Sequence, residues 1–124
     1  MRVVLDSSGW IELLSGTDRA PLFEPALRAD RLVVPSIVRY EVGRYVLVHR
    51  GMAGRERALT ALAMFEQMPV DESVADLASQ LAQAHRLAMA DALVYGAAQT
   101  VDAELWTQDK HFEHLSGVKY FRKS

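Results

Sequence analysis

Four acidic side chains stand where they could act together on one ligand. Asp6 directly follows a short apolar run at the start of the chain, and Asp109 follows a second strand-like run near its end. In a parallel sheet, ligands bind at the carboxyl ends of the strands, so both carboxylates would lie at that edge. Glu41 and Asp91 fall in segments with helical periodicity that could face the same edge. The spacing therefore predicts an acidic site built from both kinds of element.

Carboxylates gathered in this way favour a hard divalent cation. Acids held within about 4–6 Å of one another raise each other's pKa and cannot all stay ionised without a cation among them. The chain has no cysteine, and an oxygen-only site suits Mg²⁺ or Mn²⁺. His111 and His114 are three residues apart, but no third His or Cys completes a structural zinc site. We therefore interpret these two histidines as surface or packing residues.

Each aspartate also has a purely structural explanation. Asp6 could cap the helix that follows it, because Asp is a preferred N-cap residue. Asp91 could complement the dipole of its helix from the first turn. Asp109 could belong to a turn or cap a short helix. None of these explanations excludes a second role, and the ordered set of acids carries more weight than any single member.

Glu41 is the acid that a structural explanation fits least well. It falls on one helical stripe with Val38, Tyr45 and Val48, which are all apolar or aromatic. A carboxylate on a buried face must be paired, hydrated or bound to a metal. A local pair with Arg44 would serve on the surface, where it is worth a few tenths of a kcal/mol. The pattern predicts that Glu41 faces the acidic site.

The elements that must position these acids alternate between strand and helix along the whole chain. This alternation predicts an α/β domain with a mostly parallel sheet. The expected strands are residues 3–5, 32–34, 68–70, 103–107 and 118–121. Because Pro69 cannot donate to a ladder, we expect the third strand to be short or to lie at an edge.

The expected helices have recognisable ends. Gly16 can close the first helix, and Asp71 can cap a later one that carries Val74 and Leu81 on one face. A short helix beginning at Pro21 should turn four apolar residues inward, namely Leu22, Phe23, Ala26 and Leu27. Two further helices, separated by residues 51–54, should form a hairpin, the second carrying Leu59, Leu62, Phe65 and Met68.

Length and composition indicate one globular domain. With 124 residues, of which half are hydrophobic and a quarter charged, we expect a single domain spanning residues 1–124. No stretch approaches the roughly 20 apolar residues of a membrane span, and the chain does not start like a signal peptide. We therefore expect a cytoplasmic protein without membrane contact. A formal net charge of −2 excludes nucleic-acid binding by bulk charge alone, so such contact would be local or carried by metal ions.

Four motifs in order resemble the PIN-domain family, and within it the small VapC-type toxins. The motifs are Leu5-Asp6-Ser7-Ser8, the segment from Pro35 to Glu41, the segment from His85 to Leu93, and the segment from Thr107 to Phe112. Their order, spacing and total length fit the family over essentially the whole chain. A small departure is Tyr95-Gly96, where such proteins more often carry small or aliphatic residues.

The resemblance implies a fold, an activity and partners. The fold would be a PIN-like three-layer α/β/α domain with a central five-stranded, mostly parallel sheet. The activity would be Mg²⁺-dependent endoribonuclease cleavage of RNA, with Mn²⁺ as a possible substitute, by the toxin of a type II toxin–antitoxin pair. A VapB-type antitoxin would be the cognate partner, and a homodimer is also implied, with weak support from apolar helix faces around Val46 and Leu59.

By position, the resemblance also implies roles for individual residues. The catalytic and metal-binding residues would be Asp6, Glu41, Asp91 and Asp109, the last binding directly or through water. Ser7 and Thr107 could support a ligand, a carboxylate or the attacking water. Basic residues that are available for phosphate contacts, although each could also be an ordinary solvated charge, are Arg39, Arg44, Arg50, Arg55, Lys110 and Lys119.

Three other functions remain open at the level of sequence. A PIN-type nuclease could mature RNA without any toxin role. A phospho-receiver signalling domain has a similar length and an acidic Mg²⁺ site, but it should carry two adjacent acids after the first strand, where Asp6 is followed by Ser7 and Ser8. A catalytically silent interaction module could share the fold, although the presence of all four acids argues against it.

Overall fold

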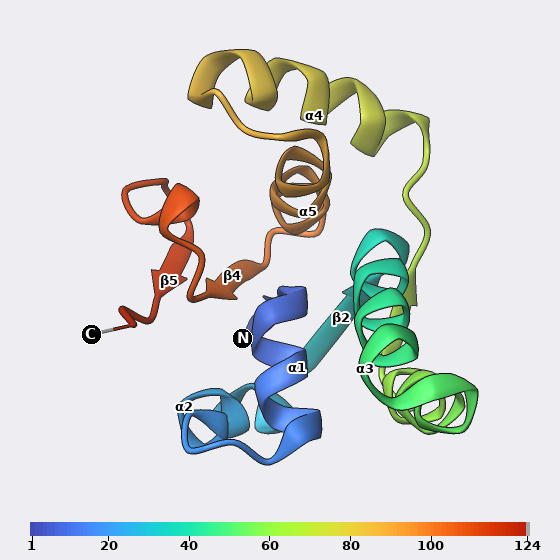
Figure 1. The fold of residues 1–124 in the computed structure, drawn as a ribbon. Coiled ribbons are helices and arrows are strands. Elements are labelled where there is room, and N and C mark those ends of the chain that lie inside the picture. The colour runs from blue at the N-terminus through green and yellow to red at the C-terminus, as the bar shows by residue number, and fades with distance from the viewer. Residues whose placement is uncertain (124) are drawn as a thin grey trace.

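The computed structural model describes residues 1–123, which form a five-stranded sheet with helices on both sides (Figure 1). The strand order is β3-β2-β1-β4-β5, and every pairing is parallel. The strands are β1 (Arg2–Leu5), β2 (Arg31–Pro35), β3 (Glu66–Met68), β4 (Glu104–Thr107) and β5 (Val118–Tyr120). The α/β architecture predicted from the alternating pattern is confirmed.

The central strand explains why the sheet is buried on both faces. In β1, the side chains of Val3, Val4 and Leu5 are completely buried, as expected for a parallel strand covered by helices on both sides. β1 pairs with β2 on one side and with β4 on the other. The first three strands are added in one direction across the sheet and the last two in the other, so the order of the strands reverses between β1 and β4. Such a switch point opens a crevice at the carboxyl ends of the two strands.

The helices form two groups around the sheet. They are α1 (Ser7–Ser15), α2 (Ala20–Phe23), α3 (Ser36–Leu62), α4 (Glu72–His85) and α5 (Met89–Thr100), with 3₁₀ turns η1 (Glu24–Arg28) and η2 (Lys110–Phe112). α1 packs against α2 and α3, whereas α4 packs against α5 (Figure 1). Within residues 1–123, no helix is both long and apolar enough to cross a membrane.

Helix ends lie where the sequence predicts them. The Asp6 carboxylate caps α1 by accepting from the Gly9 N–H, and the helix ends at Gly16 in the left-handed conformation (φ 62°). Asp71 caps α4 in the same way through the Val74 N–H. These caps depend on residues close in sequence, which is why local patterns predict them.

α3 is the helical hairpin that the sequence predicts, joined at a glycine. Gly51 adopts φ 72° and ψ −174° inside the helix, a conformation that only glycine adopts readily. The second half begins beyond it and folds back, so that the Gly43 position faces Leu59. The helix ends at Leu62 rather than continuing to Met68, because Phe65 turns inward to pack on Trp10 with ring centroids 5.4 Å apart.

Two sequence expectations are wrong, namely the inward-facing residues of the short second helix and the bounds of the third strand. Leu22 and Leu27 are 41% and 42% exposed, whereas Phe23 and Ala26 are fully buried. The chain passes from α2 into the 3₁₀ turn η1, whose period of three residues brings positions 23 and 26 onto one face. The third strand covers Glu66–Met68 rather than residues 68–70, and it does lie at an edge of the sheet.

Gly9 is expected to be required for α1 to lie close to β1. A Cβ atom there would overlap the buried Leu5 side chain and lie 3.0 Å from Phe23 Cδ1. Overpacking of this kind costs about 1–3 kcal/mol, so Gly9→Ala should lower the free energy of unfolding measured in urea. Gly43→Ala is the matched control, because the nearest atom to its Cβ is Leu59 Cδ2 at 3.5 Å. Equal stability of the two variants would contradict this packing argument.

Candidate active site

Two of the four acids are brought together by strand pairing alone. Asp6 follows β1, Asp109 follows β4 by two residues, and the neighbouring strands align Leu5 with Trp106. The Asp6 N–H continues this ladder by donating to the Trp106 carbonyl at 3.2 Å. Asp6 and Asp109 therefore lie at the carboxyl edge of the sheet, within the switch-point crevice.

Asp6 is buried and held by neutral donors. Its Oδ1 accepts from Ser8 Oγ at 2.7 Å and from the Gly9 N–H at 3.2 Å, and its Oδ2 accepts from Thr107 Oγ1. Burial raises the pKa of Asp6, and these three hydrogen bonds only partly offset that rise. The carboxylate is thus fixed in orientation but lacks a charged partner, since no donor in this set carries a positive charge.

Thr107 ties the two aspartates to each other. Its side chain is fully buried, its hydroxyl donates to Asp6, and the same oxygen accepts from the Asp109 N–H at 2.9 Å. Ser8, rather than Ser7, is the serine that contacts Asp6. The pattern missed Ser8, although a hydroxyl two residues after a capping aspartate is a signal that could have found it.

Glu41 approaches the same crevice from α3, near Ser7. Burial raises the pKa of the Glu41 carboxyl, the Ser7 hydroxyl partly offsets the rise, and Asp91, Asp6 and Asp109 raise it further. Within the described residues Glu41 forms no ion pair with Arg44. The repulsion among these acids indicates that they lie near one another.

The stripe that carries Glu41 is not the buried face that its spacing predicts. Val38 is fully buried, but Tyr45 is 40% and Val48 69% exposed. Both line a hollow of about 540 Å³ that also includes Glu41. The buried face of α3 instead passes through Val38, Val42 and Val46, which are four residues apart. Glu41 is consequently half-buried beside an open apolar wall.

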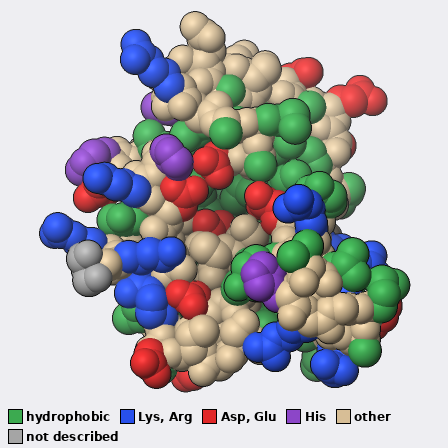
Figure 2. Space-filling model, in the orientation of Figure 1, with side chains coloured by type: hydrophobic (Ala, Val, Ile, Leu, Met, Phe, Trp, Pro, Cys, Tyr) green, Lys and Arg blue, Asp and Glu red, His purple; other side chains and the backbone are tan. Residues whose placement is uncertain are grey.

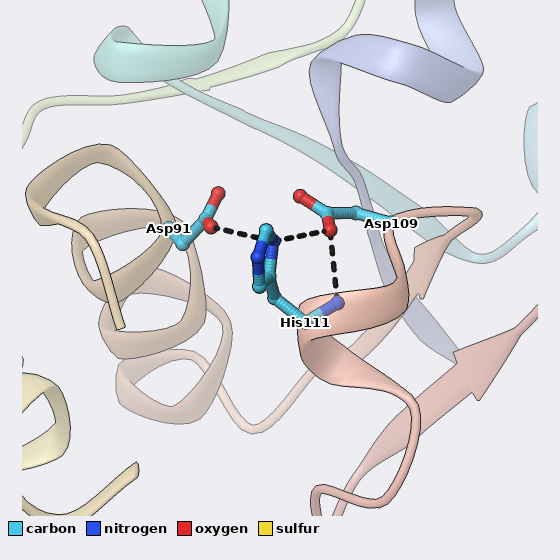
Figure 3. Close-up of side chains that lie close together, drawn as sticks. All are labelled: Asp91, Asp109 and His111. Atoms are coloured by element: carbon cyan, nitrogen blue, oxygen red, sulfur yellow. Dashed lines mark hydrogen bonds and ion pairs between the residues drawn. The ribbon is translucent and has the colours of Figure 1, made fainter. Parts of the chain in front are cut away.

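Asp91 enters the site from the first turn of α5. Burial is the main cause that raises its pKa to about 6, and the charge of Asp109 adds to this shift while His111 opposes it. The His111 ring lies between the two carboxylates, as Figure 3 shows, with Nδ1 2.8 Å from Asp109 Oδ1 and 3.8 Å from Asp91 Oδ2. The Asp109 Oδ1 also accepts from the His111 N–H at 2.9 Å.

The His111 side chain is 75% exposed, as its interpretation as a surface residue predicts, and it also lies beside two of the acids. Asp91, Asp109 and His111 each offer a ligand atom, and the three atoms lie within 4.8 Å of one another. The spacing between His111 and His114 did not indicate this position, because the partners of His111 come from α5 and from the turn after β4. The N-cap geometry of Asp109 two residues earlier is the signal that could have found it.

Of the four acids, Asp91 and Asp109 belong with His111 to the group of close ligand atoms, whereas Asp6 and Glu41 are not part of that group. Asp6, Glu41 and Asp91 all have raised pKa values. Within residues 1–123, no Lys or Arg forms an ion pair with any of the four. On the face drawn in Figure 2, acidic side chains gather near the middle, with basic side chains beside them. Hard oxygen ligands without a fixed cation favour Mg²⁺ or Mn²⁺.

Comparisons with known proteins agree with this architecture. The family model described as PIN domain matches residues 3–118. A toxin–antitoxin complex from Klebsiella pneumoniae is 24% identical, with a TM-score of 0.82, over 94% of this chain and 95% of that chain. VapBC2 from Rickettsia felis, bound to a promoter DNA fragment, is 16% identical with a TM-score of 0.79, over 98% and 100% of the two chains.

A third solved structure is more distant in sequence. VapC20 from Mycobacterium tuberculosis, described as a Sarcin-Ricin loop cleaving toxin, is 13% identical with a TM-score of 0.71, over 98% of this chain and 90% of that chain. At these identities the similarity establishes the fold. Curated protein sequences contain no match to the chain.

The strand order also decides against one alternative function. Receiver domains have the order 2-1-3-4-5, in which the first strand lies between the second and the third. Here β1 lies between β2 and β4. The phospho-receiver interpretation is therefore wrong, because the crevice is formed by a different pair of strands.

The crowded acids should destabilise the metal-free protein at neutral pH. The pKa of Asp91 is raised from 3.8 to about 6, so the folded state binds the proton more tightly and loses stability as pH rises through this window. Asp91→Asn removes that loss, and in EDTA at about pH 7.5 it should raise the free energy of unfolding by up to about 3 kcal/mol.

The gain should largely vanish near pH 4, where the unaltered Asp91 is protonated in the folded state. Urea unfolding at both pH values measures the difference. Asp76→Asn, on the exposed surface of α4, controls for the change in net charge. A gain in the free energy of unfolding that does not depend on pH, or that the Asp76→Asn control also shows, would contradict the raised pKa of Asp91.

Proposed function

Because the chain belongs to the PIN domain family, we propose that it is a metal-dependent endoribonuclease and the toxin of a type II toxin–antitoxin pair. The observation that carries this proposal is the convergence of four carboxylates at the switch-point crevice, with no paired Lys or Arg among the described residues and with raised pKa values for Asp6, Glu41 and Asp91. Solved structures with this fold include toxin–antitoxin complexes, which support the toxin role.

The metal ligands in this proposal are the four acids, Asp6, Glu41, Asp91 and Asp109. A bound Mg²⁺ or Mn²⁺ would activate water as the nucleophile and offset the negative charge that builds on the scissile phosphate. His111 Nδ1 adds one nitrogen close to Asp91 and Asp109, and a nitrogen ligand suits Mn²⁺ better than Mg²⁺. The order of metal preference is therefore a property of this site that solution binding can measure.

The chain's own residues supply positioning and proton binding. Ser8 and Thr107 hold the Asp6 carboxylate in one orientation, and Thr107 also holds the backbone of Asp109. Preorganised ligands of this kind place the phosphate and the attacking water without further rearrangement. In the metal-free protein, burial and the neighbouring acids raise the pKa of Glu41, so its carboxyl holds a proton more tightly than an exposed glutamate does. Hydrolysis of this type would leave a 5′-phosphate and a 3′-hydroxyl.

The acids should be essential for cleavage but not for folding. Glu41→Gln and Asp91→Asn each remove one charged ligand while keeping the side-chain shape, so we expect cleavage of a mixed RNA panel to fall at least 100-fold, the usual scale for losing one electrostatic catalytic group. The unaltered protein should cut in Mg²⁺ or Mn²⁺ and stop in EDTA. Asp76→Asn should retain full activity, because this residue lies on the exposed surface of α4.

Circular dichroism would check that the variants keep their fold. Retention of full metal-dependent cleavage by both Glu41→Gln and Asp91→Asn would refute the site assignment. A catalytically silent interaction module on this fold would show no metal-dependent cleavage by the unaltered protein.

A toxin role further implies a protein partner and a defined assembly. A VapB-type antitoxin would place a basic side chain in the acidic crevice and so satisfy the repelling carboxylates.

We also propose a homodimer. The side chain of Val46 is buried within the chain, whereas Leu59 lines an open hollow together with Leu47. The large exposed hydrophobic side chains of α3, which are candidates for a dimer surface, are Tyr40, Tyr45, Leu47, Val48 and Met52.

Growth experiments distinguish a toxin from an RNA-maturation enzyme with the same site. Expression of the unaltered chain in bacteria should arrest growth, because an unrestrained endoribonuclease destroys RNA, whereas Glu41→Gln should not. Co-expression of the protein encoded by the adjacent reading frame should restore growth and yield a complex in size-exclusion chromatography. Normal growth, combined with RNA cleavage by the purified protein, would favour RNA maturation.

A further inference from the structure

A second hollow adjoins the acidic site on the side of β5 and η2. Its volume is about 720 Å³, and its lining includes Asp109 and Ser8, which also belong to the acidic site. The remaining lining residues are Gln108, Lys110, Glu113, Tyr120, Arg122 and Lys123. The two spaces therefore form one continuous surface through Asp109.

This hollow, which we call the basic hollow, is positively charged, whereas the adjoining site of the four carboxylates is negatively charged. Lys110, Arg122 and Lys123 outnumber the two acids in its lining, although the whole chain has a net charge of −2. Within residues 1–123, none of these three cations forms an ion pair. Figure 2 shows Lys and Arg side chains beside the acidic cluster on this side of the molecule. The cations thus remain available for a ligand.

A buried polar network holds the segment that carries two of these cations. Arg19 donates to Gln108 Oε1 at 2.7 Å and to the carbonyl oxygens of Phe121 and Arg122 at 3.2 and 3.3 Å. Gln108 in turn donates to Glu12 Oε2 at 2.9 Å. These contacts anchor the chain after β5 against the end of β4. Arg122 and Lys123 are therefore placed by the fold rather than by a free tail.

The positive charge of Arg19 is paired with the carboxylate of Glu12 within this network. Burial alone would raise the pKa of Glu12, but hydrogen bonds from Gln108 and Thr17, together with the charges of Arg19 and, to a smaller extent, Lys123, outweigh it and lower the pKa. Glu12 is therefore ionised and Arg19 is committed to it, at 3.6 Å. Consequently the hollow relies on Lys110, Arg122 and Lys123 for its free positive charge.

The opposite side of the acidic site has a different character. The hollow beside Glu41 is lined by Tyr40, Tyr45, Ile11 and Val48, and Arg44 is the single Lys or Arg among its lining residues. A phosphate backbone approaching four carboxylates is repelled unless cations offset the charge nearby. The backbone of a bound strand would therefore be favoured on the basic side and disfavoured on the apolar side.

From this asymmetry we infer that the basic hollow is the subsite for the phosphate backbone of single-stranded RNA flanking the scissile bond. Lys110, Arg122 and Lys123 contact phosphates, and Tyr120 offers a ring for an unpaired base, as aromatic residues do in single-strand recognition. The inference rests on the proposed nuclease function. It adds the side of the acidic site on which the RNA backbone lies.

Of the six basic residues that the sequence suggested for phosphate contacts, three are engaged elsewhere, and Arg44 and Arg50 line other hollows. Arg39 donates to the Leu59 carbonyl, Arg55 pairs with Glu56, and Lys119 lies over the Trp106 ring at 4.2 Å from its centroid. Lys110 alone among the suggested residues lines the basic hollow.

RNA binding by paired variants tests the subsite. Arg122→Ala with Lys123→Ala removes two cations from the hollow, and Arg50→Ala with Arg57→Ala removes two from a separate hollow that includes Leu14 and Ser15, at the end of α1 remote from Asp6. All proteins carry Glu41→Gln, so that labelled single-stranded RNA is not cut in Mg²⁺. Fluorescence anisotropy over a range of salt concentrations gives the dissociation constants.

We expect the Arg122 and Lys123 double variant to bind about 10-fold more weakly and to lower the salt slope by about 1.4, since each phosphate contact to a single strand contributes roughly 0.7. The Arg50 and Arg57 control should stay within about 2-fold in affinity. Arg122→Lys should retain binding, and thermal unfolding checks the fold. With Glu41 intact, the double variant should raise KM and leave kcat unchanged, as expected for lost substrate binding.

The possible failures are distinguishable. If the double variant binds RNA as well as the control, the subsite is refuted, while metal-dependent cleavage by the unaltered chain would leave the nuclease proposal standing. If the unaltered chain neither binds nor cuts RNA, the nuclease proposal is refuted and this inference with it.

Discussion

Electrostatic repulsion among carboxylates at one edge of the sheet is the constraint on which the rest of this structure depends. Pairing of β1 with β4 places Asp6 and Asp109 side by side, and α3 and α5 add Glu41 and Asp91. Burial is the largest cause of the raised pKa values of Asp6, Glu41 and Asp91, and repulsion among the acids adds to it. A folded protein keeps such a cost where a cation can relieve it, so the strain and the proposed chemistry have the same origin.

The structural and chemical roles of these acids are complementary rather than competing. Asp6 caps α1 and Asp109 caps η2, while Asp91 lies in the first turn of α5. Each helix N-terminus offers partial positive charge to an anion, which lets the carboxylates remain close to one another before any cation binds. The caps also fix their orientation, so the same hydrogen bonds that end a strand and begin a helix preorganise the site.

The surfaces on the two sides of the acids differ in chemistry, because one is basic and the other is apolar. On one side, the network of Arg19, Gln108 and Glu12 anchors a basic segment, and on the other the exposed part of α3 presents aromatic and aliphatic side chains. An acidic site of this kind would repel a polyanion on its own, so the basic side gives the substrate a favourable approach. The apolar side is suited to protein contacts, which the proposed toxin role would require.

The sequence by itself determined the α/β alternation, the caps at Asp6, Asp71 and Gly16, and the order of the four acids, because these features depend on residues within a turn or two of each other. Only the tertiary structure decided that Leu22 and Leu27 face outward, that Tyr45 and Val48 leave the core, and that His111 joins the acids. It alone also assembled the basic hollow from residues about 100 positions apart, such as Ser8 and Gln108. Those outcomes depend on which faces pack across the sheet, and local periodicity carries no information about that choice.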